Sequence, residues 1–267
     1  MDGIGYIEDI CSILRNLISF CNNMNSMKNH ILLIPVIMLF LVSVVSASTT
    51  FSNNFESLNE ISADGGVIQG SATIVDGAFG NGVYLPGTSA IKFPKMDFAD
   101  QGMISFWVKP DYDVRSFARY ETASFLEVGD FPGSDSMAVW VYKSEYGPFL
   151  PFEMKDSYAR IKQVWSKKNR LNPDKWHQII LAWSVNNPKG KKNYIRIYVD
   201  GKGSKRFKGG LRDVYLDNKS IRIGNAGFYY GESATFDKLE VYSGFSEFKV
   251  LKKQYKTWYK AWKKANK

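Results

Sequence analysis

Cysteine and histidine are nearly absent from this sequence. The only two cysteines, Cys11 and Cys21, and one of the two histidines, His30, lie within the first 47 residues. The rest of the chain therefore has no disulfide, no cysteine-based metal site and no cysteine nucleophile. It is long enough to bury a sizeable core, so packing must stabilise it, helped at most by a metal ion.

Long apolar runs without charge are also scarce, and the longest occupies residues 31–47. It follows Lys28 and His30 and ends in Ser46-Ala47, small residues that suit a signal peptidase. Its length is at the short end of the roughly 17–25 residues that a membrane-spanning helix needs. We therefore expect residues 27–47 to be a signal peptide or a membrane anchor, and the protein to be secreted or held at the cell surface. Residues 1–26 are a leader extension, either from a misplaced start codon or an amphipathic helix.

Acidic residues are scarce at the C-terminus, where the last 22 residues hold eight lysines against Glu247. Most of the net charge of +9 therefore belongs to this tail. Apolar residues recur there every three or four positions, from Phe245 to Trp262. This spacing predicts a basic amphipathic helix over residues 246–267, with Ser246 as a plausible N-cap. Such a helix suits anionic lipid head groups or an acidic envelope polymer, but its aromatic stripe can equally pack on the domain.

Between these ends, short runs of β-branched and aromatic residues alternate with Gly, Pro, Asn and Asp. Residues 176–184 are mostly bulky and apolar, as in a strand buried on both faces, and residues 194–199 precede a tight turn at Asp200-Gly201. The two are expected to pair as antiparallel strands. Runs of this kind without intervening helices predict one all-β domain of two packed sheets over residues 48–245. Further strands are expected at residues 50–55, 67–75, 82–85, 90–93, 103–109, 123–128, 137–143, 149–154, 160–165, 205–207, 220–223 and 234–242.

Four segments of this region carry motifs in a fixed order. They are DGAFGNGVYLPG at residues 76–87, MISFWVKP at 103–110, KWH at 175–177 with YIRIYVDG at 194–201, and IRIG at 221–224 with FDKLEVY at 236–242. Together they resemble the laminin-G-like jelly rolls of the concanavalin A-like lectin/glucanase superfamily. The resemblance covers nearly all of residues 50–251 and implies a two-sheet antiparallel jelly-roll sandwich. The family's Asp-Glu pair near the end is Asp237-Lys238 here, so no role that needs a second carboxylate is expected at that position.

The glucanases of this superfamily carry a Glu-x-Asp-x-x-Glu strand, because retaining hydrolysis needs two carboxylates roughly 5–5.5 Å apart. Here Glu127 and Asp130 have the wrong spacing, and Glu153 with Asp156 has no third carboxylate at the right step. His177 lies on a buried strand without a cysteine or serine motif, which favours a structural role over a catalytic one. We therefore expect no enzyme activity, and a hydrolase with an unfamiliar site is the weakest alternative.

Calcium is the one cofactor that the resemblance suggests. Many members of the family hold a calcium ion near the point where the first and last strands meet. The resemblance places the aspartate of that site at Asp237, and Glu56 is the acidic residue in the region of the first strand. Calcium takes six to eight oxygen ligands, including main-chain carbonyls that a sequence does not reveal. The alternative is that both side chains are ordinary surface carboxylates.

Sugars bind lectins through stacking on aromatic rings and a few hydrogen bonds. Aromatic residues that border polar, glycine-containing turns are therefore candidates, although strands of a sandwich also need such residues for packing. They are Trp140, Tyr142, Tyr146, Tyr229 and Tyr230, of which the last two, in a Gly-flanked loop, are favoured.

The expected function is non-catalytic binding of carbohydrate or another cell-surface polymer, with the tail helix as an envelope or membrane contact. The alternative is a structural or adhesion protein that binds a protein partner. Nucleic acid is not an expected partner of an exported chain, although the basic tail alone would permit contact with phosphates.

Overall fold

The computed structural model describes residues 48–117, 121–166, 171–187, 193–205, 207–208, 211–225, 232–243 and 259–260. The chain divides into a unit at Met1–Ser46 and a second compact unit, Ala47–Lys267, to which all of these residues belong. The expected leader, the signal or anchor segment and most of the predicted tail helix lie outside them, so those predictions stay open. No helix within the described ranges is long and apolar enough to cross a membrane.

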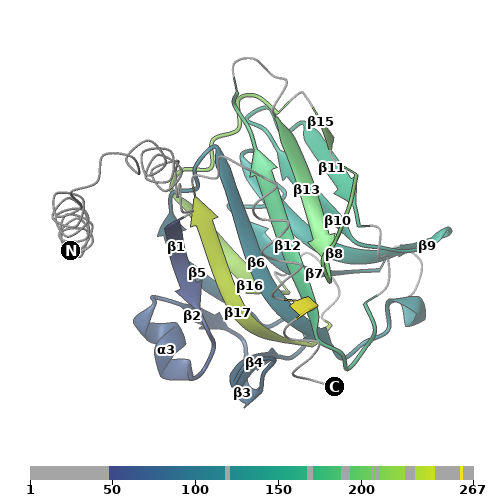
Figure 1. Cartoon of the computed structure of the whole chain (residues 1–267). Helices are drawn as coiled ribbons and strands as arrows, with labels where there is room; N and C mark the ends of the chain where they lie inside the picture. The colour runs from purple at the N-terminus through teal and green to yellow at the C-terminus, as the bar shows by residue number, and fades with distance from the viewer. Residues whose placement is uncertain are drawn as a thin grey trace, which may run out of the picture. The chain divides into compact units, whose positions relative to one another are not determined.

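Two antiparallel sheets face each other across one apolar core (Figure 1). The first, sheet A, contains β1 (Ser48–Asn53), β3 (Thr73–Asp76), β4 (Asn81–Leu85), β6 (Gln101–Pro110), β12 (His177–Ser184), β13 (Tyr194–Val199), β14 (Lys202–Gly203), β15 (Phe207–Lys208) and β17 (Ala234–Ser243). Its order is β14-β13-β12-β6-β17-β4-β3, with β1 beside β17 and β15 beside β13.

The second, sheet B, contains β2 (Val67–Gln69), β5 (Ala90–Met96), β7 (Thr122–Val128), β8 (Ser136–Ser144), β9 (Gly147–Phe149), β10 (Pro151–Lys155), β11 (Ile161–Trp165) and β16 (Lys219–Gly224). Its order is β11-β10-β8-β7-β16-β5-β2, with β9 beside β8. Neighbours in space are often far apart in sequence, as expected for a jelly roll, and the predicted all-β sandwich is confirmed.

The predicted pair of long strands lies near the middle of sheet A. All eight residues of β12 are buried. They pair antiparallel with β6 on one side and with β13 on the other, so that Ile180 lies opposite both Ser105 and Tyr198. A central strand buried on both faces explains why residues 176–184 lack polar alternation.

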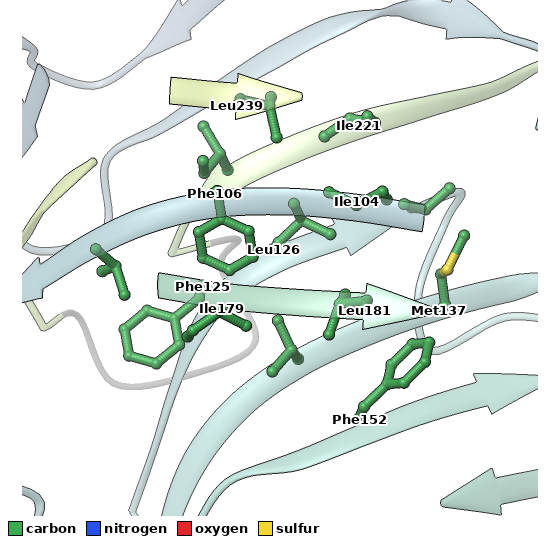
Figure 2. Packing of buried hydrophobic residues seen from close by; sticks show 14 of the residues in the cluster. Ile104, Phe106, Phe125, Leu126, Met137, Phe152, Ile179, Leu181, Ile221 and Leu239 are labelled. Atoms are coloured by element: carbon green, nitrogen blue, oxygen red, sulfur yellow. The ribbon is translucent and has the colours of Figure 1, made fainter. Parts of the chain in front are cut away.

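The core is filled by alternate residues of both sheets, as Figure 2 shows. Sheet A contributes side chains such as Ile104, Phe106, Ile179, Leu181 and Leu239, and sheet B contributes Phe125, Leu126, Met137, Phe152 and Ile221. All ten are at most 1 % exposed. Burial of this apolar surface is the main stabilising contribution in a domain whose described residues contain no cysteine.

Two of the expected strands are each divided in the structure. Residues 67–75 form β2 in sheet B and β3 in sheet A, because the chain turns at Gly70, which has a φ of +86°. A Cβ atom there would lie 2.6 Å from Ser89 Oγ, so the turn requires glycine. Residues 149–154 are divided between β9 and β10, which end and begin on either side of Leu150.

A short helix, α3 (Leu58–Ala63), contradicts the expectation that no helix intervenes between strands. Ser57 caps it, since its hydroxyl accepts a hydrogen bond from the Glu60 amide at 3.0 Å. Ile61 is the one buried residue of the helix and anchors it to the core. The Ser-x-x-Glu spacing at residues 57–60 is a capping signal that can be read in the sequence, although no helix was predicted there.

Only two residues of the tail are described, Tyr259 and Lys260, and both are helical. The Tyr259 ring stacks on Trp107, with centroids 6.5 Å apart and the planes at 22°. Trp107 alternates with the core residues Phe106 and Val108, so it faces away from the interior. At this point the tail packs on the outer face of sheet A, and contact with lipid stays a prediction.

Candidate functional site

One row of polar side chains crosses the outer face of sheet B. Its members lie directly opposite one another on adjacent strands and alternate with core residues. They are Lys92 of β5, Arg222 of β16, Glu127 of β7, Ala138 of β8, Glu153 of β10 and Gln163 of β11. We call this set the polar row. It places two carboxyl groups on one face with only the small Ala138 side chain between their strands.

Glu127 is 1 % exposed, and one of its carboxylate oxygens, Oε2, lies 3.5 Å from Arg222 Nη1. Burial removes water from the charged form and raises its pKa to about 7, while the positive charge of Arg222 lowers it in part. The other oxygen, Oε1, is buried and has no hydrogen-bond partner in the described part of the chain. Such a group is costly to bury unless something pairs with it.

Glu153 is 5 % exposed, and its Oε2 accepts a hydrogen bond from Gln163 Nε2 at 3.3 Å. Burial raises its pKa as well, and the charge of Lys155 opposes that effect. Because two strand spacings separate Glu127 from Glu153, their Cα atoms are roughly 10 Å apart. This pair is not visible along any single strand of the sequence, because only the register of three strands creates it, and it was not predicted.

An aromatic patch adjoins the polar row on the same face of sheet B. Tyr142 and Phe149 lie opposite each other, with ring centroids 5.4 Å apart. Trp165 lies 5.8 Å from Tyr142 and 5.1 Å from Phe149. Trp140, two residues before Tyr142, packs against Phe131 at 5.2 Å. We call Trp140, Tyr142, Phe149 and Trp165 the aromatic patch, and Trp165 is 40 % exposed at its edge.

The structure brings together two of the five aromatic residues predicted to bind sugar. Trp140 and Tyr142 share the outer face of β8, because they are two positions apart. Tyr146 lies in the turn between β8 and β9 and is 84 % exposed. Tyr229 and Tyr230 lie outside the described residues. Phe149 and Trp165 were missed, although the exposed Ile161 and Trp165 in β11 share one face by their spacing.

The two predicted calcium ligands meet at one turn, residues 77–81. Glu56 accepts a hydrogen bond from the Asn81 amide at 3.0 Å, and its own carbonyl accepts one from the Asn81 side chain. Asp237, on β17, accepts a hydrogen bond from the Phe79 amide at 2.8 Å. Gly80 has a φ of +78°, and a Cβ atom on it would lie 2.5 Å from Glu56 Oε1. Glycine is therefore needed for the turn to fit against the carboxylate.

Asp237 is fully buried, and its Oδ1 atom has no hydrogen-bond partner among the described residues. Burial raises its pKa to about 7, and the negative charge of Glu56 raises it further against the effect of the backbone donors of the turn. Among the described residues, no positive charge lowers this pKa. An unpaired buried carboxylate oxygen beside a second carboxylate fits a hard cation such as calcium. Within the described ranges, no three His, Cys, Asp or Glu side chains group as a metal site, so main-chain carbonyls would have to complete the set.

His177 has the contacts of a structural histidine. Its Nδ1 atom lies 2.9 Å from Asp200 Oδ2, and its Nε2 atom accepts a hydrogen bond from the Asn172 amide at 2.9 Å. The other carboxylate oxygen of Asp200 accepts a hydrogen bond from the Gln178 amide. The ring thus holds the turn at Asp200-Gly201 to the segment that precedes β12, in agreement with the role expected from the sequence.

A family model described as "Concanavalin A-like lectin/glucanases superfamily" matches residues 85–245. Among solved structures, domain 4 of an extracellular GH43 arabinanase from Geobacillus stearothermophilus, in complex with arabinotriose, is similar with a TM-score of 0.55 and 17 % identity. The match covers 79 % of this chain and 98 % of that domain. No curated protein matches the sequence.

Two toxin structures are also similar. The binding domain of Paraclostridial Mosquitocidal Protein 1 has a TM-score of 0.60 and 15 % identity, with 80 % of this chain and 52 % of that chain covered. The ligand-binding domain of botulinum neurotoxin serotype D, in complex with N-acetylneuraminic acid, has a TM-score of 0.56 and 14 % identity, with 79 % and 51 % covered. The chain thus spans about half the length of these toxin domains. At such identities the likeness establishes the fold alone.

Proposed function

The chain belongs to the concanavalin A-like lectin/glucanase superfamily, and from this premise we propose that it is an exported, non-catalytic carbohydrate-binding domain. The observation that carries the proposal is the aromatic patch beside the polar row on the outer face of sheet B. Rings supply a flat apolar surface for the C–H groups of a sugar, and the half-buried Gln163 beside them supplies a polar group for its hydroxyls. The arabinanase domain with arabinotriose and the toxin domain with N-acetylneuraminic acid support the same class of ligand.

The test is binding of the full chain to an array of plant, bacterial and animal glycans. In Trp165→Ala and Tyr142→Ala we expect affinity for the best glycan to fall by about tenfold, because each loses a large ring contact. Tyr158→Ala is the matched control, since Tyr158 is 70 % exposed and lies in the turn between β10 and β11, away from the patch. Unchanged affinity in both patch variants would move the binding elsewhere. Binding to a protein partner alone would favour the adhesion protein instead.

We also propose a structural calcium ion held by Asp237, Glu56 and main-chain carbonyls of residues 77–81. Support comes from the buried Asp237 oxygen without a partner and from the second carboxylate at the same turn. A bound divalent cation would neutralise the two charges and tie β17 to the segment after β1. The ion would stabilise the fold and takes no part in ligand chemistry.

Glycoside hydrolysis is the second candidate function, and the pair Glu127 and Glu153 is the observation that favours it. Two carboxyl groups on one face, one of them with a raised pKa, are typical of glycosidases. Their exposures of 1 % and 5 % leave little room for a sugar bond between them, which favours the binding domain. Release of reducing ends from polysaccharides by the full chain, lost in Glu127→Gln and in Glu153→Gln, would establish the hydrolase.

A further inference from the structure

An open hollow of about 620 Å³ lies at the end of the sandwich where β6 begins and β12 ends. We call it the rim hollow. Its lining is Asp100, Asn186, Asn187, Arg212, Asp213 and Tyr215. None of these residues belongs to the aromatic patch, to the polar row or to the proposed calcium site. The size lies within the usual range of small-molecule sites.

Three loops that form the rim hollow are joined by side-chain hydrogen bonds of Asn186. Its amide nitrogen donates to Asp100 Oδ1 at 2.8 Å and to the Val214 carbonyl at 2.6 Å. Its amide oxygen accepts from the Val214 amide at 3.0 Å. The backbone adds a bond from the Asn186 amide to the Leu211 carbonyl at 2.9 Å. The hollow is therefore held in shape before a ligand arrives, which lowers the entropic cost of binding.

The groups that face a ligand are of mixed chemistry. Tyr215 is 56 % exposed, although its backbone is held by a 2.9 Å hydrogen bond from its amide to Asp135 Oδ1. Arg212 and Asp213, three and two positions before Tyr215 in the sequence, are also exposed. A ring, a guanidinium donor, two carboxylates and two amides suit a polyhydroxylated, uncharged ligand. Among the described lining residues two carboxylates accompany one arginine, which disfavours a strongly anionic ligand.

The rim hollow is well separated from the aromatic patch. The bond between Tyr215 and Asp135 places the hollow at the start of β8, whereas Tyr142 lies near its other end. From Ser136 to Tyr142 the strand extends roughly 20 Å. Trp140, the patch residue nearest the hollow on β8, lies roughly 13 Å along the strand from Ser136, so a long glycan could occupy both surfaces.

From this lining and separation we propose that the rim hollow is a second carbohydrate site, which takes one uncharged sugar unit stacked on Tyr215 and hydrogen-bonded to Asp213 and Arg212. The inference does not depend on the aromatic patch. If both sites bind the same polymer, the second contact becomes intramolecular and raises affinity for long chains above that for short ones.

The experiment is an NMR titration of the full chain with arabinotriose, cellotriose and maltotriose. We expect Tyr215→Ala to weaken the hollow's binding by about fivefold, through loss of the ring contact. Asp213→Asn should weaken it by about tenfold, through loss of a charge-assisted hydrogen bond. Tyr215→Phe keeps the ring and should retain the affinity, which separates ligand contact from local structure.

A double variant, Tyr142→Ala with Trp165→Ala, separates this site from the outer face of sheet B. If the double variant still binds sugar and loses that binding when Tyr215→Ala is added, the rim hollow is supported, even if the patch binds nothing. Binding that disappears in the double variant, with Tyr215→Ala and Asp213→Asn both neutral, overturns the rim site and leaves the patch in place. Absence of sugar binding by the unmodified chain also overturns it.

Discussion

Two buried carboxyl groups, one in each sheet, share a raised pKa but differ in their surroundings. Glu127 in sheet B and Asp237 in sheet A are at most 1 % exposed, and each has a pKa raised to about 7 by burial. Arg222 stands 3.5 Å from Glu127, whereas the nearby charge that acts on Asp237 is the like charge of Glu56. The same raised pKa therefore belongs to one carboxyl group whose charge Arg222 partly compensates and to another whose nearby charge has the same sign.

The largest expected effect is an unusual dependence of stability on pH. Both groups have folded-state pKa values above their unfolded values, 4.5 for Glu127 and 3.8 for Asp237. The stability they contribute is complete below those unfolded values and is lost as pH rises to about 7. In the absence of divalent cations, the free energy of unfolding should be up to about 5 kcal/mol lower at pH 8 than at pH 5. Urea denaturation at the two pH values measures this, and a higher value at pH 8 would contradict both assignments.

Calcium should stabilise the protein through the site at Asp237 and should have no effect through Glu127. At pH 8 and a concentration 100 times its Kd, calcium should raise the free energy of unfolding by about 2.7 kcal/mol. Asp237→Asn should abolish this gain, whereas Glu127→Gln should retain it. Thermal denaturation in calcium and in chelator, for the unmodified chain and the two variants, gives the answer. An equal Tm in both solutions would remove the metal proposal.

Removal of Arg222 should leave Glu127, like Asp237, without a nearby positive charge from the described residues. Arg222→Ala deletes the only cation that lowers the Glu127 pKa by its charge, apart from any group outside the described residues. We expect about 2 kcal/mol lower stability at pH 8 and little change at pH 5, where Glu127 is protonated. Lys92→Ala, one strand further along the polar row, is the control. A loss of equal size at both pH values would mean that Arg222 acts through packing alone.

The smallest effect should come from Glu56, and it should have the opposite sign. Glu56→Gln removes the like charge that raises the pKa of Asp237. Without calcium we expect a gain of up to about 1 kcal/mol at pH 8, offset in part because an amide oxygen accepts the Asn81 hydrogen bond more weakly. With calcium the same variant should be less stabilised than the unmodified chain. A loss of stability in both solutions would show that the Asn81 contacts outweigh the repulsion.

Only some residues of the candidate site could be predicted from the sequence. Trp140 and Tyr142 were predicted as sugar-binding candidates because they border polar, glycine-containing turns, and their spacing of two residues places them on one face of β8. Glu153, Phe149 and Trp165 join them only through pairing of β8 with β9 and β10 and of β10 with β11. Pairing across strands depends on turn geometry and on long-range packing, neither of which is local to the residues concerned.

Local patterns in the sequence were enough to predict the all-β class, the buried strand β12, the core alternation and the absence of disulfides from the described domain. These follow from local patterns, because an apolar side chain at every second position of a strand has one favourable direction, the core. The folded structure was needed to show that residues 67–75 divide between two sheets and that Glu127 and Glu153 share a face. Each of these depends on segments far apart in the chain, which only the packing of two sheets brings together.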